Sequence, residues 1–121
     1  MRVRNNYSYN KTKKKSEGGN RDDVGIKTEG NKLEVMLDGR MDSSTAPEFE
    51  KEVFPKLEGI TELILYFDRL AYLSSAGLRV LLSCQKKMTA AQGTMIVKHV
   101  NEIVMEVFEA TGFDSILTIE D

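Results

Sequence analysis

The hydrophobic positions along this chain change from a strand-like to a helix-like spacing near its centre. Residues 63–67 form the longest uninterrupted apolar run, with the length and composition of a strand that is buried on both faces. Four apolar residues that follow, Leu78, Leu81, Leu82 and Met88, are spaced so that they share one face of a helix. The pattern therefore predicts a buried strand followed by an amphipathic helix.

Strand-like segments occur at four further places. They are residues 26–29, 32–37, 94–97 and 116–119. A Gly30-Asn31 turn joins the first two, so we expect them to form a β-hairpin. Residues 39–43 and 68–71 are expected to be loops that follow the strands before them.

Three helices are predicted from their capping residues. Their expected starts are Thr45, Ser74 or Ser75, and Asn101. The first helix has a candidate capping box in residues 45–48 and should end near Phe54 or Leu57, whereas Gly112 should close the third. From Leu33 onward strands and helices alternate. This order predicts an α/β fold with parallel neighbouring strands, right-handed crossovers and helices packed on the sheet.

Length and composition indicate a single domain. The chain has 121 residues, of which 40% are hydrophobic and 30% charged, as in a soluble globular domain. No apolar run approaches the roughly 20 residues that cross a bilayer, and the first residues lack the apolar stretch of a secretory signal. Cys84 is the only cysteine and lies in an apolar stretch, so it is expected to be a small buried hydrophobe. We expect a cytoplasmic protein without a membrane partner.

The charges are unevenly distributed. Residues 1–23 contain seven Lys or Arg and three acids, whereas residues 24–121 contain ten and sixteen, which gives net charges near +4 and −6. The first segment has almost no aliphatic residues to bury, so we expect it to be disordered. Such a tail could bind nucleic acid or an acidic surface. It could equally be a solvated extension, or the result of a start codon assigned too early, and the acidic body argues against direct nucleic-acid binding.

The start of the second predicted helix carries the candidate chemistry of the chain. Free amide N–H groups and the positive end of the helix dipole favour an anion at this position by roughly 0.3–1 kcal/mol. A phosphate added to Ser74 or Ser75 would therefore not disrupt the helix. The structural alternative is that these serines only cap the helix.

Two motifs resemble the signatures of the STAS domain and, more narrowly, of the bacterial anti-sigma-factor antagonists. They are Gly39-Arg40-Met41-Asp42 and Leu73-Ser74-Ser75-Ala76-Gly77-Leu78-Arg79. The resemblance implies a STAS-like mixed β-sheet with an N-terminal hairpin and three to four helices packed on it. It divides the chain into a tail, residues 1–23, and a STAS domain, residues 24–121. It also implies an anti-sigma factor that is a serine kinase as the partner, and a PP2C-type phosphatase that reverses the phosphorylation.

The resemblance assigns the phosphoacceptor to Ser75, with Ser74 as the alternative. The partner-binding residues that it implies are Asp42, Asp68, Ser74, Ser75, Gly77 and Arg79. If both aspartates lie beside the phosphate, its charge of about −1.5 to −2 makes an acidic patch more acidic and repels the partner. Asp42 and Gly77 also have structural interpretations, as a residue that orders its loop and as a position where a side chain would clash.

Tyr66 departs from the family pattern, which commonly has Asp or Asn at this position. Asp68 follows two residues later, and two residues along an extended chain return to the same face. We therefore expect Asp68 to substitute in part for the missing acid.

The alternative class, an enzyme, has little support. The candidate catalytic residues of an enzyme would be Ser75, His99, Asp68 and Cys84. The chain has neither a Gly-x-Ser-x-Gly elbow nor a Gly-x-x-x-x-Gly-Lys phosphate loop. One His and one Cys also argue against a zinc site. We expect a non-enzymatic switch protein without a cofactor. The alternative function is a regulatory STAS module of another signalling or transport assembly, without sigma-factor control.

Overall fold

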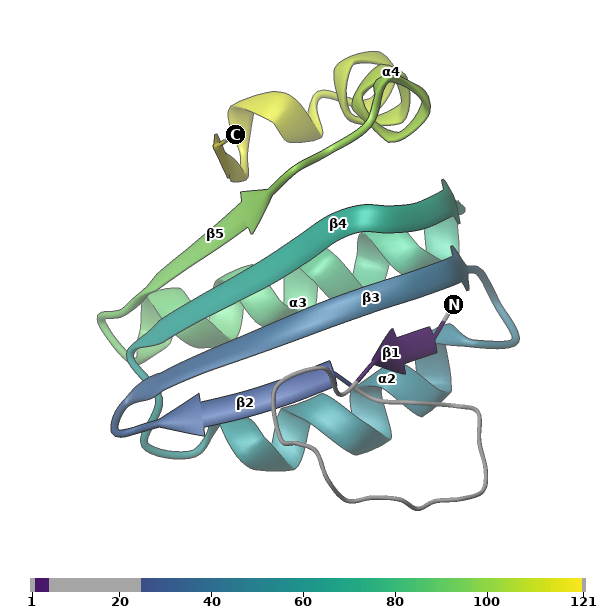
Figure 1. Cartoon of the computed structure of the whole chain (residues 1–121). Coiled ribbons are helices and arrows are strands. Elements are labelled where there is room, and N and C mark those ends of the chain that lie inside the picture. Colours follow the sequence, from purple (N-terminus) through teal and green to yellow (C-terminus); the bar gives the residue numbers. More distant parts are fainter. Residues whose placement is uncertain (1, 5–24, 121) are drawn as a thin grey trace, which may run out of the picture.

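The computed structural model describes residues 2–4 and 25–120 of the chain (Figure 1). The elements in chain order are β1 (Arg2–Arg4), β2 (Gly25–Glu29), β3 (Lys32–Met41), α2 (Ala46–Val53), the 3₁₀ helix η2 (Phe54–Leu57), β4 (Glu62–Leu73), α3 (Ser75–Ala90), β5 (Thr94–Lys98), α4 (Glu102–Thr111), η3 (Phe113–Ser115) and β6 (Thr118–Glu120). The predicted disordered tail lies mostly outside the described residues. Its first part differs from the prediction, because Arg2–Arg4 form a strand.

The strands form one mixed sheet. The order is β1-β3-β4-β5-β6, and β2 also pairs with β3. Strands β1 and β2 are antiparallel to β3, whereas β3, β4, β5 and β6 are parallel neighbours. The predicted hairpin and the predicted parallel order are both confirmed.

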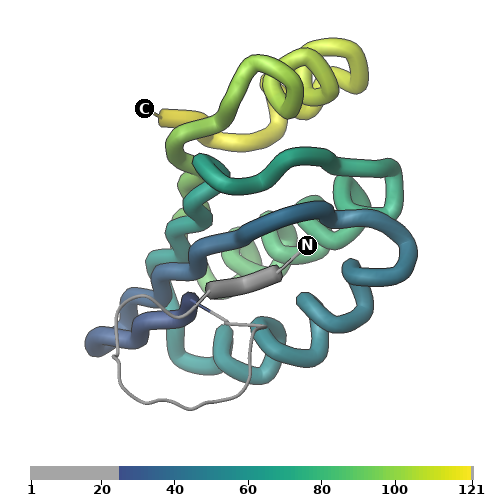
Figure 2. The backbone as a smooth tube through the Cα atoms, turned by 45° about the vertical axis from the view of Figure 1, so that its right-hand side comes forward, coloured from purple at the N-terminus to yellow at the C-terminus, as the bar shows by residue number. Residues whose placement is uncertain are grey.

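The helices divide the molecule into a covered and an open side. Helices α2 and α3 run along the same face of the sheet, behind it in Figure 1, and the turned view of Figure 2 keeps both on that side. Helix α4 lies beyond β4 and packs on it through Phe108, whose ring centre is 6.2 Å from that of Phe67. No helix within the described ranges is long and apolar enough to cross a membrane.

Strand β4 is longer than predicted, and the expected loop at residues 68–71 is wrong. β4 has 12 residues against 10 in β3, and two register shifts absorb the difference. Each shift is a β-bulge, in which one extra residue of β4 faces a shorter stretch of β3. As a result the side chains buried in this half are three residues apart, at Phe67, Leu70 and Leu73. This spacing differs from the alternation that identifies a strand in a sequence.

The expected loop at residues 39–43 is also wrong in its first three positions. Gly39, Arg40 and Met41 complete β3 and pair with Leu70, Tyr72 and Leu73. Gly39 has a φ of 94°, a conformation that glycine adopts without strain, and it lies at the second register shift. The bulged half of β4 thus has a partner strand along its whole length.

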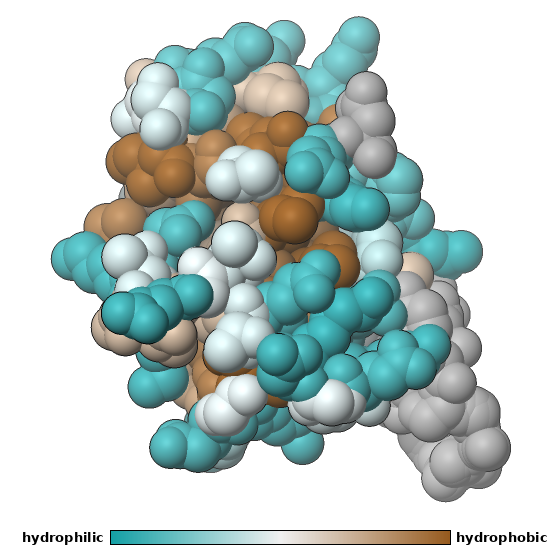
Figure 3. Space-filling view, turned by 90° about the vertical axis from the view of Figure 1, so that its left-hand side faces the viewer, coloured by the Kyte–Doolittle hydropathy of each residue, from teal (hydrophilic) through white to brown (hydrophobic). Residues whose placement is uncertain are grey.

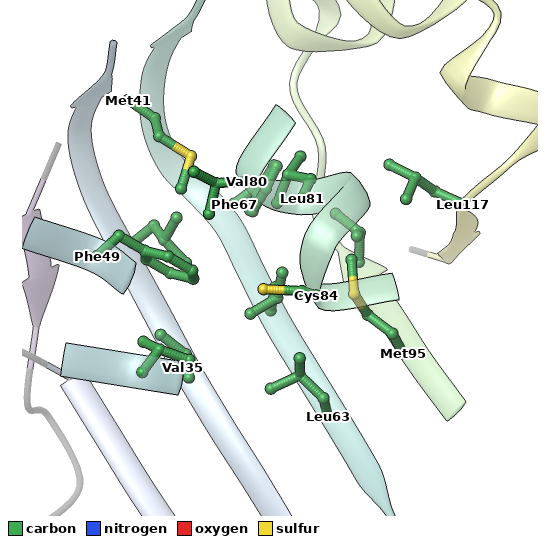
Figure 4. Close-up of a cluster of buried hydrophobic side chains, with 14 of the residues drawn as sticks. Val35, Met41, Phe49, Leu63, Phe67, Val80, Leu81, Cys84, Met95 and Leu117 are labelled. Atoms are coloured by element: carbon green, nitrogen blue, oxygen red, sulfur yellow. The ribbon is translucent and has the colours of Figure 1, made fainter. Parts of the chain in front are cut away.

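The core lies between the sheet and the helices α2 and α3 (Figure 4). Phe49 of α2, Phe67 of β4 and Leu81 of α3 are fully buried in it. Cys84 is also fully buried, as predicted, and burial raises the pKa of its thiol to about 12. The thiol is therefore packed as a hydrophobe.

The ends of the helices follow the predictions in part. The Asn101 side chain accepts a hydrogen bond from Val104 N at 2.9 Å, and Gly112 closes α4 in the left-handed region. Thr45 stands at the N-cap of α2 but makes no capping bond, so the predicted capping box is wrong. The last strand begins at Thr118, two residues later than predicted, because η3 occupies the segment before it.

Hydrophobic atoms are exposed near the C-terminal elements. Figure 3 views the molecule from the left of Figure 1 and shows a hydrophobic band across the upper half of this face. Ile103 and Ile116 are the exposed large aliphatic residues of the described chain. They belong to α4 and to the segment after η3.

Candidate phosphoacceptor site at the start of α3

The two serines at the start of α3 differ in exposure. Ser74 is the extended N-cap residue, and its backbone N–H donates to Met41 O at 2.9 Å. Its hydroxyl is buried, has no hydrogen-bond partner among the described residues and does not cap the helix. Ser75, the first helical residue, is exposed. Of the two serines, only Ser75 is therefore exposed at the surface.

Gly77 allows α3 to lie directly against the end of β3. A Cβ atom at this position would be 2.6 Å from Leu73 Cδ1 and 2.8 Å from Met41 O. Both separations are shorter than real Cβ contacts, so a side chain would push the helix away from the strand. The packing interpretation of Gly77 is thus supported by its surroundings.

Asp42 orders the turn between β3 and α2. Its Oδ1 accepts hydrogen bonds from Ser44 Oγ at 2.8 Å, Ser44 N at 3.0 Å and Thr45 N at 3.2 Å. These bonds hold the pKa of Asp42 well below its ordinary value, the Ser44 hydroxyl most strongly, then Ser44 N–H, with Thr45 N–H and Arg40 adding to the effect. Asp42 is therefore a structural carboxylate, as one of its two interpretations predicted.

Arg40 lies next to this carboxylate and was not among the predicted site residues. Its Nε donates to Asp42 Oδ2 at 3.4 Å, and its guanidinium carbon is 4.9 Å from the centre of the Tyr72 ring. Because Arg40 and Asp42 are two residues apart, their contact could have been predicted from the sequence. The contact with Tyr72 comes from the register of β3 and β4 and has no sequence signal.

Comparison with protein-family models identifies the family of this chain. The STAS domain model matches residues 24–121. The chain belongs to the STAS domain family. BtrV, a Bordetella bronchiseptica protein named as an anti-sigma factor antagonist, is 37% identical over 88 residues, which are 72% of this chain and 76% of BtrV.

Two solved structures show the same STAS fold. A Thermotoga maritima protein described as an anti-sigma factor antagonist matches with a TM-score of 0.74 and 23% identity, over 79% of this chain and 84% of that chain. The Bacillus cell fate determinant SpoIIAA in its phosphorylated form matches with a TM-score of 0.63 and 17% identity, over 79% and 89%. At these identities the likeness concerns the fold alone.

Asp68 does not lie beside the serines of the STAS motif. It is an exposed residue of β4, five positions before the strand ends at Leu73. The rise of an extended chain places it on the order of 15 Å from that end. The expectation that Asp42 and Asp68 flank a phosphate together is therefore wrong, because residues 68–73 are strand and not loop.

Tyr66 is engaged within the sheet. Its hydroxyl donates to Glu34 Oε2 at 2.8 Å, and its ring stacks on His99 at 5.8 Å. A register shift follows Tyr66, and the next β4 residue paired with β3 is Arg69. The two-residue repeat on which the substitution by Asp68 rested is thus interrupted.

The remaining candidates have the following positions. Arg79 is exposed and lies four residues after Ser75, on the same side of α3. His99 follows β5, beside Tyr66 and away from the end of β4 where Ser75 lies, so no serine–histidine pair forms. Among the described residues, no group of three or more His, Cys, Asp or Glu side chains could hold a metal ion.

Proposed function

We propose that this STAS protein is an anti-sigma-factor antagonist that is switched off by phosphorylation of Ser75. The observation that carries the proposal is the exposure of Ser75 beside the buried hydroxyl of Ser74. Relatives named as anti-sigma factor antagonists support the role, and SpoIIAA is a protein of this fold that has a phosphorylated form.

The unmodified protein binds an anti-sigma factor that is also a serine kinase, and this binding frees the sigma factor. The start of α3 is held against the end of β3, because Gly77 lets the helix contact Met41 and Ser74 N donates to Met41 O. A PP2C-type phosphatase restores the unmodified form. The protein itself is a substrate of these enzymes and catalyses no reaction.

Phosphorylation weakens the complex because the new charge lies in an interface that fits the neutral hydroxyl. A phosphate adds about −1.5 to −2 charges at pH 7, and the helix N-terminus tolerates it, so the fold is kept while the partner is repelled. A coupling of about 1–3 kcal/mol corresponds to a 5- to 150-fold loss of affinity.

The first experiment is incubation with the candidate kinase and ATP, followed by mass spectrometry of the peptide from Leu70 to Arg79. We expect one phosphate on Ser75 and weaker binding of the modified form. Ser75→Ala should bind the partner and resist modification, whereas the matched control Ser74→Ala should still be phosphorylated. Ser75→Asp should mimic the off state only in part, since a carboxylate lacks the charge and oxygens of a phosphate.

Other results have distinct meanings. Phosphate on Ser74 would move the switch by one residue, and tight binding without modification would indicate a constitutive adaptor. Recovery of membrane transport subunits without an anti-sigma factor from native cells would favour a regulatory STAS module of a transport assembly. The antagonist role would be contradicted if the protein neither bound the candidate kinase nor was modified by that kinase or by cell extract.

We also propose that residues 24–121 fold and act as the STAS domain without the basic tail. The family match begins at residue 24, whereas β1 adds only three residues to the edge of β3. A variant that lacks residues 1–23 should keep its cooperative unfolding and its binding to the anti-sigma factor. Salt-sensitive binding of nucleic acid by the full chain, lost with the tail, would instead assign a function to the tail.

A further inference from the structure

Arg40, near the end of β3, is held by contacts that a stronger partner could replace. Its hydrogen bond to Asp42 is 3.4 Å long, beyond the usual range for a charged pair, and the side chain is 63% exposed. A guanidinium has five N–H donors, and among the described residues this is the one hydrogen bond that Arg40 donates through them. Most of its capacity to bind an anion is unused.

Asp42 does not depend on Arg40 for its position. The bonds from Ser44 and Thr45 all reach Oδ1, whereas Arg40 contacts Oδ2. Thr45 Oγ1 also accepts from Asp42 N at 2.9 Å and donates to Arg40 O at 2.9 Å. The turn therefore keeps its hydrogen bonds if the guanidinium moves away.

The strand register places Arg40 close to Ser75. Arg40 pairs with Tyr72, Met41 pairs with Leu73, and Met41 O accepts from Ser74 N. One strand spacing and three residues separate Arg40 from Ser75, which corresponds to a Cα separation on the order of 10 Å. A long arginine side chain that already points along the strand toward Asp42 can meet a phosphoserine side chain across this distance.

We propose that Arg40 binds the phosphate of phosphorylated Ser75, in exchange for its contact with Asp42. This inference rests on the proposed function, because it takes Ser75 as the phosphoacceptor. A phosphate offers three acceptor oxygens, and arginine binds it through two parallel hydrogen bonds, which are stronger than the single long contact with Asp42. Phosphorylation then changes the surface formed by Arg40, Tyr72 and Asp42 as well as the charge of Ser75.

Arg79 is a second cation near the candidate phosphoacceptor. It lies one helical turn after Ser75 and is exposed. Unlike Arg40, it comes from the same element as the phosphoserine, so pairing with it would leave the end of β3 unchanged. Separate substitutions of the two arginines decide between them.

The test uses protein with phosphoserine installed at position 75 during translation, so that no kinase is required. A ³¹P NMR titration measures the second pKa of the phosphate, which is about 6 when unpaired. Arg40→Ala should raise this pKa by about 0.2–0.7, the shift that an exposed charge pair corresponds to. Arg40→Lys should give an intermediate value, since lysine keeps the charge but lacks the planar fork.

Two further arginine variants show whether the change in the phosphate pKa is specific to Arg40. Arg69→Ala removes an exposed arginine four residues before the end of β4 and should leave the phosphate pKa unchanged. An unchanged pKa in Arg40→Ala, or a change in Arg79→Ala alone, would overturn the role of Arg40. Because the phosphate is installed without a kinase, these results are independent of whether an anti-sigma kinase binds the protein.

Discussion

The two ends of β4 are built differently. Residues from Glu62 to Tyr66 pair without a shift with β3 on one side and β5 on the other. Beyond Tyr66, β5 has ended, and β4 continues beside β3 alone with two bulges. The candidate phosphoacceptor follows this second, irregular end.

A side chain bonds to one carbonyl on the free edge of the bulged half. Asn101 Nδ2 donates to Leu70 O at 2.7 Å, while its Oδ1 caps α4. One residue therefore joins α4 to the part of β4 that no strand covers on that side. The candidate site at Ser75 therefore follows the end of β4 that lacks a regular strand on both sides. There, side-chain hydrogen bonds and helix packing contribute more to the backbone conformation than a continuous ladder of strand hydrogen bonds does.

The largest effect is expected from removal of a core side chain in the bulged half. Leu70→Ala should destabilise the protein by about 2–5 kcal/mol, as much as Leu65→Ala in the regular half, because both side chains are fully buried. Urea unfolding of both variants measures this. The exposed neighbour is the control, and Asp68→Ala should change stability by less than about 0.5 kcal/mol. A small effect of Leu70→Ala would mean that residues 68–71 are a loop after all.

Two glycines provide the next test, Gly77 after the bulged end of β4 and Gly93 against Thr61, which precedes its regular end. A Cβ at Gly93 would meet three backbone atoms of Thr61, whereas at Gly77 it would meet the movable Leu73 Cδ1 and a single backbone atom, Met41 O. Both Gly→Ala variants should lose about 1–3 kcal/mol by overpacking, and Gly93→Ala should lose more. Thermal unfolding compares them. If Gly77→Ala were as stable as the wild type, α3 would not be held against β3.

Substitution of two asparagines compares the side-chain hydrogen bonds near the two ends of β4. Asn101→Ala should lose about 1–3 kcal/mol, because it removes a helix cap and leaves Leu70 O without its partner. Asn31→Ala at the regular end removes an exposed bond to Thr61 Oγ1 and should lose about 0.5–1.5 kcal/mol. Denaturant unfolding at pH 7 measures both. Equal losses would contradict a special role of Asn101 in the bulged half.

The smallest effect concerns the pH dependence of stability at the site. The pKa of Asp42 is lowered below its ordinary value of 3.8 in the folded state, so its contribution is present above about pH 4 and is lost as the pH falls below this value. Asp42→Asn should therefore lose less stability than the wild type between pH 5 and pH 3. Parallel pH profiles for the two proteins would show that the bonds from Ser44 and Thr45 do not favour the ionised carboxylate.

Sequence signals that depend on near neighbours predicted much of this protein. The hairpin turn, the start of α3 and both ends of α4 follow from residues within a few positions of one another, and the STAS motifs led to the family. The largest errors lie in residues 39–41 and 68–71. Their strand conformation depends on a partner strand some 30 positions away, and bulges replaced the alternation by a three-residue spacing.

By itself the sequence determined the order of the main strands and helices from residue 25 onward, the two caps of α4 and the two candidate serines, because turns, caps and periodicity act over short stretches of chain. Tertiary structure decided which serine is exposed, since the contact of α3 with the end of β3 buries the hydroxyl of Ser74. It also placed Asp68 five residues before the end of β4 and Arg40 opposite Tyr72, close to that end. These results depend on cross-strand register and on packing, which arise only when distant segments meet.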